Sequence, residues 1–179
     1  MKKKDEILRM FPAKLREILG QVPGDYEDVQ EIRLRAGEPL LVVKDGREYY
    51  ISPAGQLEKR LCQAAAITPD QIRETVEYMS SYSLYAFEEE LRQAFLTLQG
   101  GHRVGLAGQA VLEGGRIKSL KYISFLNVRI SHQRRGCAEK LLPYLCREGE
   151  VLSTLLVSPP RCGKTTILRD LIRLISNGD

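Results

Sequence analysis

Hydrophobic residues recur at helical spacing near the start of the chain. Those on the shared face are Ile7, Leu8, Phe11, Leu15, Ile18 and Leu19. Intervals of three and four residues place side chains on one side of a helix, which predicts helical structure over residues 5–20. Pro12 interrupts the pattern, so we predict a second short helix that begins there and ends at Gly20. The apolar face is expected either to pack into a core or to dock against a partner.

Residues 31–52 change to the alternation that is typical of strands. Ile32 and Leu34 alternate with charged residues, as in a half-buried strand. A short apolar run at residues 40–43 is followed by Asp45-Gly46, a pair that accepts the positive φ angles of a type I′ turn. We therefore predict three strands, of which the last two form a hairpin.

A helix is predicted to begin after residue 68. Thr68 can cap its first turn, and Pro69 suits the first helical position. The stretch SYSLYAFEEELRQ, residues 81–93, is predicted to carry a second helix.

A long hairpin is predicted over residues 94–130. Two alternating runs are separated by Glu113-Gly114-Gly115, and a Gly-Gly pair between such runs indicates a turn. Residues 136–150 predict a short helix that is broken near Pro143, with a linker near residues 147–151.

The last part of the chain has the order strand, loop, helix. STLLV is a short apolar run that predicts a buried parallel strand, SPPRCGKTT over residues 158–166 is the loop, and ILRDLIRLI has helical spacing. The alternative for residues 151–157 is an exposed segment that pairs with a neighbouring chain. This order is the context in which a P-loop motif is credible. The predicted fold class is therefore α/β, with an α+β N-terminal domain over residues 1–147 and the start of a P-loop ATPase domain over residues 148–179.

The loop has the residue types that bind a nucleotide triphosphate. Its expected ligand-binding residues are Pro159, Pro160, Arg161, Cys162, Gly163, Lys164, Thr165 and Thr166. Backbone N–H groups at a helix N-terminus surround a phosphate, and a glycine lets the chain approach closely. The ammonium of Lys164 is expected to reach the β- and γ-phosphates of ATP, and the hydroxyl of Thr165 to ligate Mg²⁺. Ser158 stands where the motif G-x-x-x-x-G-K-[ST] has its first glycine.

A P-loop ATPase also needs an acidic residue on a second strand of a parallel sheet. Only four residues follow Ile175, and none of them supplies such a strand. We therefore expect this chain to be the N-terminal part of a longer ATPase and to be inactive in ATP hydrolysis by itself.

Composition and charge indicate which partners and which cellular compartment to expect. The net charge of +4 allows an anionic partner such as ATP, acidic lipid or nucleic acid without requiring one. No segment reaches the ~18 apolar residues that span a bilayer, and the four cysteines are scattered, which is typical of a reducing compartment. The expected location is the cytoplasm, with any membrane association through partners.

Three stretches together resemble one bacterial family. EIRLRAGEPLLVV, GGHRVGLAGQAVLEGGRIKSLKYISFLNVRIS and SPPRCGKTTILRDLIR, in this order, are similar to the stage III sporulation protein AA family, part of the secretion-ATPase superfamily. The resemblance runs from about residue 30 to the end of the chain.

The resemblance implies an N-terminal α/β domain linked to a RecA-like ATPase core, of which this chain holds only the start. It implies hexameric rings that act from the mother-cell cytoplasm on a channel complex between mother cell and forespore. The partners would then be ATP, other copies of the chain and membrane channel proteins. In related motors, arginines of the N-terminal domain touch the nucleotide's phosphates, and Arg103 and Arg129 are the nearest matches. Ordinary solvated strand charges are the alternative interpretation of both.

Two other functions remain open at this stage. A nucleic-acid-binding module attached to a P-loop would account for the basic excess, although no G-x-x-G clamp lies between two helices and no aromatic residues interleave with a basic run. Nucleic acid is therefore not an expected partner. A non-catalytic domain that docks a membrane partner is compatible with the motor hypothesis.

Overall fold

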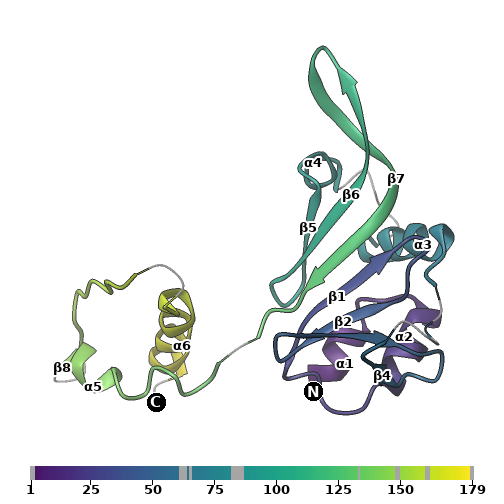
Figure 1. Cartoon of the computed structure of the whole chain (residues 1–179). Coiled ribbons are helices and arrows are strands. Elements are labelled where there is room, and N and C mark those ends of the chain that lie inside the picture. The colour runs from purple at the N-terminus through teal and green to yellow at the C-terminus, as the bar shows by residue number, and fades with distance from the viewer. Residues whose placement is uncertain are drawn as a thin grey trace. The chain divides into compact units, whose positions relative to one another are not determined.

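The computed structural model describes residues 3–60, 64, 66–81, 87–132, 134–147, 150–159 and 162–177. The chain divides into two compact units, Met1–Ser131 and His132–Asp179. Figure 1 shows the elements of both units. No helix among the described residues is long and apolar enough to cross a membrane.

The N-terminal unit is built on an antiparallel seven-stranded sheet with the order β4-β3-β2-β1-β7-β6-β5 (Figure 1). The strands are β1 (Val29–Arg35), β2 (Leu41–Lys44), β3 (Arg47–Ile51), β4 (Leu57–Glu58), β5 (Phe95–Leu98), β6 (His102–Glu113) and β7 (Arg116–Arg129). β1 pairs with β2 on one side and with β7 on the other. It therefore joins the two predicted groups of strands, which are far apart in sequence, into one sheet.

Local signals set the turn and the helix start that the sequence predicts. Asp45 and Gly46 have φ angles of 50° and 70°, as the turn between β2 and β3 requires. The third helix, α3 (Pro69–Met79), begins with a capping box in which the Thr68 side chain accepts from the Gln71 amide and the Gln71 side chain accepts from the Thr68 amide. These predictions are confirmed.

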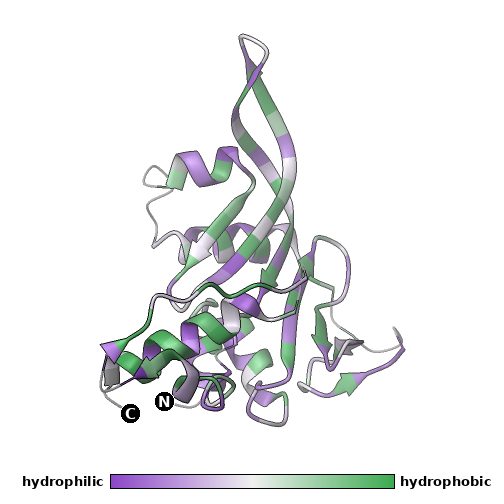
Figure 2. Cartoon of the chain, turned by 90° about the vertical axis from the view of Figure 1, so that its left-hand side faces the viewer, coloured by the Kyte–Doolittle hydropathy of each residue, from purple (hydrophilic) through white to green (hydrophobic). Residues whose placement is uncertain are grey.

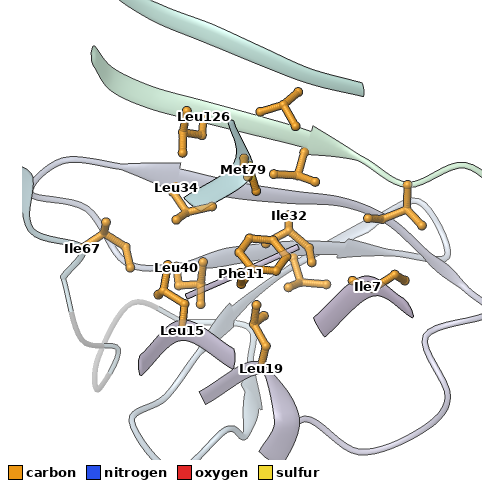
Figure 3. Close-up of a cluster of buried hydrophobic side chains, with 14 of the residues drawn as sticks. Ile7, Phe11, Leu15, Leu19, Ile32, Leu34, Leu40, Ile67, Met79 and Leu126 are labelled. Atoms are coloured by element: carbon orange, nitrogen blue, oxygen red, sulfur yellow. The ribbon is translucent and has the colours of Figure 1, made fainter. Parts of the chain in front are cut away.

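One face of the sheet is covered by α1 (Lys3–Leu8), α2 (Ala13–Gln21) and α3, which supply the core drawn in Figure 3. Ile7, Leu15 and Leu19 from the first two helices, and Phe11 between them, are 0–1% exposed. The interpretation of this helical face as a core face is therefore confirmed. Pro12 is the N-cap of α2 rather than its first residue, and the helix continues through Gly20 to Gln21.

The long hairpin is confirmed for β6 and β7, with Gly114 and Gly115 at its turn in left-handed conformations, whereas residues 95–98 of the predicted first run form the separate strand β5. The helix that was predicted within residues 81–93 is α4 (Glu88–Arg92), and the part of that prediction over residues 82–86 lies outside the described residues.

The C-terminal unit contains α5 (Leu142–Leu145), the two-residue strands β8 (Cys146–Arg147) and β9 (Glu150–Val151), and α6 (Lys164–Asn177). Its small core consists of Ala138, Leu171 and Leu174, against which Leu141, Leu142, Leu145 and Ile167 pack. The unit begins at His132, earlier than the boundary predicted after residue 147, because residues before that boundary pack on α6. Pro143 lies in the first turn of α5 instead of breaking a helix, and a β8–β9 ribbon stands at the predicted linker.

The strand predicted from STLLV is not formed: residues 152–157 lie outside the strands of the described chain. Leu155 and Val157 are 85% and 78% exposed. A buried parallel strand needs hydrogen-bonded neighbours on both sides and covered faces. No described strand pairs with this segment, so its apolar residues remain on the surface.

Candidate functional site

The candidate phosphate-binding loop ends where α6 begins, at Lys164. The preceding residue, Gly163, has φ +76°, and a Cβ built on it would meet no atom within 4 Å. Glycine is required here by the left-handed backbone and not by lack of space, because residues with a Cβ rarely adopt this conformation. The predicted loop-to-helix junction is confirmed.

The side chain of Lys164 turns back toward the loop. Its Nζ donates to the carbonyl oxygens of Ser158 and Pro159, each at 2.8 Å, and lies 3.4 Å from the Ser158 hydroxyl. These oxygens hold the cation above the loop at the start of α6. An anion at this place would meet a positive charge together with the positive end of a helix dipole.

Ser158 is compatible with the position that the motif gives to glycine. Its φ is not among the positive values found for non-glycine residues of the described chain. The serine therefore carries no left-handed strain, and it adds a hydroxyl to the carbonyls that contact Lys164.

The other residues that were predicted to bind the nucleotide precede or follow Lys164 in the sequence. Cys162, Thr165 and Pro159 are exposed, whereas Thr166 is half-buried. The carbonyl oxygen of Thr166 lies 3.9 Å from the Cys137 thiol, which donates to it. Pro160 and Arg161 were also predicted to bind the ligand, and both lie outside the described residues.

A buried carboxylate fixes α6 to the segment before it. Asp170 is 4% exposed and accepts from the Ala138 amide at 3.0 Å and from Nε of Arg173 at 3.0 Å. Burial alone would raise the pKa of Asp170, but these two partners lower it below its ordinary value. The charged form of Asp170 therefore holds residues 136–145 against the helix that carries Lys164.

The two predicted arginines are neighbours in the sheet of the N-terminal unit. Arg103 on β6 and Arg129 on β7 are directly paired in the antiparallel register, and both are exposed. Directly paired residues project from the same face of a sheet. That face is opposite the core, because the adjacent residues Val104 and Val128 are fully buried.

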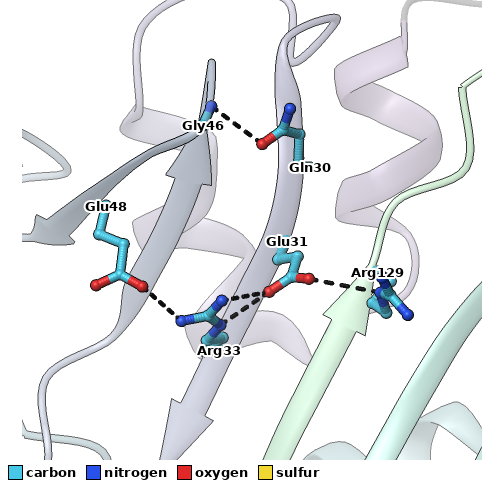
Figure 4. A network of polar contacts seen from close by, with 6 residues as sticks. All are labelled: Gln30, Glu31, Arg33, Gly46, Glu48 and Arg129. Atoms are coloured by element: carbon cyan, nitrogen blue, oxygen red, sulfur yellow. Dashed lines mark hydrogen bonds and ion pairs between the residues drawn. The ribbon is translucent and has the colours of Figure 1, made fainter.

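Carboxylates neutralise part of this arginine face (Figure 4). Glu31 pairs with Arg33 at 2.6 Å and with Arg129 at 3.5 Å, and Arg33 also contacts Glu48 at 2.7 Å. The pKa of Arg33 is raised, chiefly by its hydrogen bond to Glu31. Arg103 makes no hydrogen bond or ion pair through its guanidinium with any described residue. Among the described residues, the pair thus contains one guanidinium without an ion-pair partner, that of Arg103, and one with a single long contact, that of Arg129.

Comparison with known proteins places these features in a family. The family described as Sporulation stage III, protein AA matches residues 1–179, the whole chain. The chain belongs to this family. Stage III sporulation protein AA of Bacillus subtilis (strain 168) is 38% identical over 175 residues. The match covers 97% of this chain and 53% of that protein, so the chain spans about half the length of its curated relative.

Two solved structures of ATPases are similar to the chain. The ATPase DotB of Legionella pneumophila matches with a TM-score of 0.41 and 11% identity, over 96% of this chain and 42% of that one. The VirB11 ATPase of the Brucella suis type IV secretion system, in complex with sulphate, matches with a TM-score of 0.37 and 14% identity, over 99% of this chain and 43% of that one.

Two site residues of this member of the sporulation stage III AA family were missed by sequence reasoning. Ser158 was regarded only as a departure from the motif, although it supplies two oxygens to Lys164. Asp170 was not singled out at all. Its signal was present, because it lies on the same helical side as Ile167, Leu171 and Leu174, where an acid is unusual and needs a partner.

Proposed function

We propose that this chain is the N-terminal part of an ATP-binding motor subunit that acts in sporulation. The observation that carries the proposal is the position of Lys164: its ammonium is held over the loop by the Ser158 and Pro159 carbonyls, at the N-terminus of a 14-residue helix. A triphosphate that enters the loop would replace these carbonyl oxygens as the partner of the Lys164 ammonium. It would also accept hydrogen bonds from the loop's N–H groups. Mg²⁺ would arrive with the nucleotide, with Thr165 as its protein ligand.

The family supports the sporulation setting, and the P-loop supports nucleotide binding. On this proposal the whole gene product forms a hexameric ring in the mother-cell cytoplasm and powers or assembles the channel complex with the forespore. On the same proposal, the acidic residues that ATP hydrolysis needs would lie outside residues 1–179. The assignment of residues 1–147 to an N-terminal domain and of residues 148–179 to the start of an ATPase domain is part of the same proposal, although residues 138–145 pack on α6.

Arg103 and Arg129 are proposed to contact the nucleotide's phosphates. They share one exposed face, and within the described part of the chain neither makes a short ion pair: the contact of Arg129 with Glu31 is 3.5 Å long. An arginine that stabilises the charge of a transferring phosphoryl group can accelerate the reaction by orders of magnitude.

The test is Mg·ATP binding by the intact gene product that contains residues 1–179, measured by isothermal titration calorimetry. Lys164→Ala is expected to weaken binding about tenfold or more, because the principal cation at the β- and γ-phosphates is lost. Lys140→Ala, an exposed lysine of the same unit, is the matched control and should bind like the unaltered protein. Absence of Mg·ATP binding, or equal binding by Lys164→Ala, would refute the proposal.

A further inference from the structure

The hairpin formed by β6 and β7 extends beyond the rest of the sheet. Residues 109–113 pair only with residues 116–121 among the described strands, because β5 pairs with β6 no further than Gly105 and β1 pairs with β7 no further than Phe125. Figure 1 shows the two strands projecting from the N-terminal unit. We call residues 109–121 the hairpin arm.

The end of the hairpin arm exposes a pair of aliphatic side chains. Leu112 and Ile117 are directly paired across the arm and are 65% and 44% exposed. The turn between them is Gly114-Gly115, which has no side chains to cover them. This pair stabilises the hairpin only through its own cross-strand contact and adds nothing to the core, since no described core residue packs on it.

Basic side chains lie directly behind this tip. Arg116, Lys118 and Lys121 are all exposed, and Glu113 is the arm's one acidic residue. Lys118 pairs with Glu113 at 2.8 Å in a solvent-exposed ion pair, which is weak and easily exchanged. The arm therefore combines a net positive charge with exposed apolar groups, and Figure 2 shows hydrophobic and hydrophilic stretches following one another along it.

We propose that the hairpin arm binds the surface of an anionic membrane directly, with Leu112 and Ile117 inserted among the lipid headgroups and Arg116, Lys118 and Lys121 paired with lipid phosphates. Aliphatic groups flanked by lysine and arginine are the combination that binds anionic bilayer surfaces. A lipid surface can bind a narrow protruding hairpin, because this binding needs no complementary pocket. A stable protein interface needs about 800 Å² of well-packed surface on each partner, which two side chains and a glycine turn do not offer.

The test is co-sedimentation of the chain with vesicles of phosphatidylcholine alone and of phosphatidylcholine mixed with phosphatidylglycerol, at low and high salt. We expect binding to the anionic vesicles that weakens as salt rises, and little binding to the neutral ones. Leu112→Ser/Ile117→Ser and Lys118→Glu/Lys121→Glu are each expected to weaken it about tenfold. All four positions are exposed on the arm, so circular dichroism should show an unchanged fold.

Two control variants separate the arm from other surfaces. Lys59→Glu/Arg60→Glu makes the same change in net charge at exposed positions outside the arm. Leu155→Ser/Val157→Ser removes exposed apolar groups of the C-terminal unit. Both controls should bind the anionic vesicles normally.

Three results would overturn the proposal. One is equal binding to neutral and anionic vesicles, and another is a loss of binding in either control but not in the arm variants. The third is an arm-dependent self-association in analytical ultracentrifugation without any vesicle binding, which would assign the arm to a second copy of the chain.

Discussion

Glu6 of the first helix is joined to His102 of strand β6, with 2.9 Å between Oε1 and Nε2. His102 is fully buried, and its other ring nitrogen, Nδ1, accepts from the amide of Ser131 at 3.1 Å. The ring proton is therefore on Nε2 and is donated to the carboxylate. Through this one ring the N-terminal helix is connected to the last residue of the N-terminal unit.

This contact predicts a pH-dependent contribution to stability. Burial alone would raise the pKa of Glu6, but hydrogen bonds from His102 and Lys3 lower it below its ordinary value of 4.5. A lowered carboxyl pKa stabilises the folded state above the unfolded pKa, and this stabilisation is lost as the pH falls through the folded pKa. Glu6→Gln should cost about 1 kcal/mol at neutral pH, and the difference from the unaltered protein should shrink as the pH falls below 4.5.

Urea unfolding followed by circular dichroism at several pH values measures this difference. His102→Phe keeps an aromatic ring but removes both hydrogen bonds, so it should cost about 2 kcal/mol. A Glu6→Gln effect of the same size at every pH would contradict the role of the charge.

Replacing Arg103 or Arg129 is predicted to lower the ATPase rate without lowering the stability of the fold. Arg103→Ala and Arg129→Ala remove exposed side chains, so each should change the free energy of unfolding by less than about 0.5 kcal/mol. In the intact gene product each should lower the ATPase rate about a hundredfold or more, while Mg·ATP binding changes less. Arg47→Ala, another exposed strand arginine, is the control and should keep full activity. Full activity in the Arg103→Ala/Arg129→Ala double variant would show that both are ordinary surface charges.

A side chain at position 163 is predicted to strain the backbone without causing a steric clash. Because the space around it is open, Gly163→Ala should disturb the loop only through its φ of +76°, at about 1–2 kcal/mol. In the intact gene product this should weaken Mg·ATP binding about tenfold, because the loop leaves the geometry in which Lys164 is presented. Calorimetric titration measures it, and Gly105→Ala in β6, where φ is not positive, is the control. Unchanged affinity would mean that the loop binds in another conformation.

The buried carboxylate of Asp170 is predicted to slow hydrogen exchange in the segment that it contacts. Its carboxylate accepts the Ala138 amide, so Asp170→Ala should speed exchange at that amide and across residues 136–145. Arg169→Ala, an exposed neighbour on α6, should leave the exchange rates unchanged. NMR or mass-spectrometric exchange at neutral pH makes the comparison. Slow exchange at Ala138 in Asp170→Ala would show that packing alone holds the segment.

The sequence by itself determined the features that depend on neighbouring residues. Asp45-Gly46 formed its turn, Thr68 and Gln71 capped α3, and the loop before Lys164 led into a helix, because the energies that favour these structures act within a few residues. The alternation of buried and exposed positions also showed which face of β1 meets the core.

Only the tertiary structure decided how distant segments pair. The insertion of β1 between β2 and β7, and with it the placement of Arg129 between Arg103 and Glu31, depends on contacts across about a hundred residues. The segment 152–157 has the composition of a strand but is not one, since a strand exists only when neighbours complete its hydrogen bonds. Burial of His102 between Glu6 and Ser131 is likewise invisible in sequence, because nothing local distinguishes a buried histidine from an exposed one.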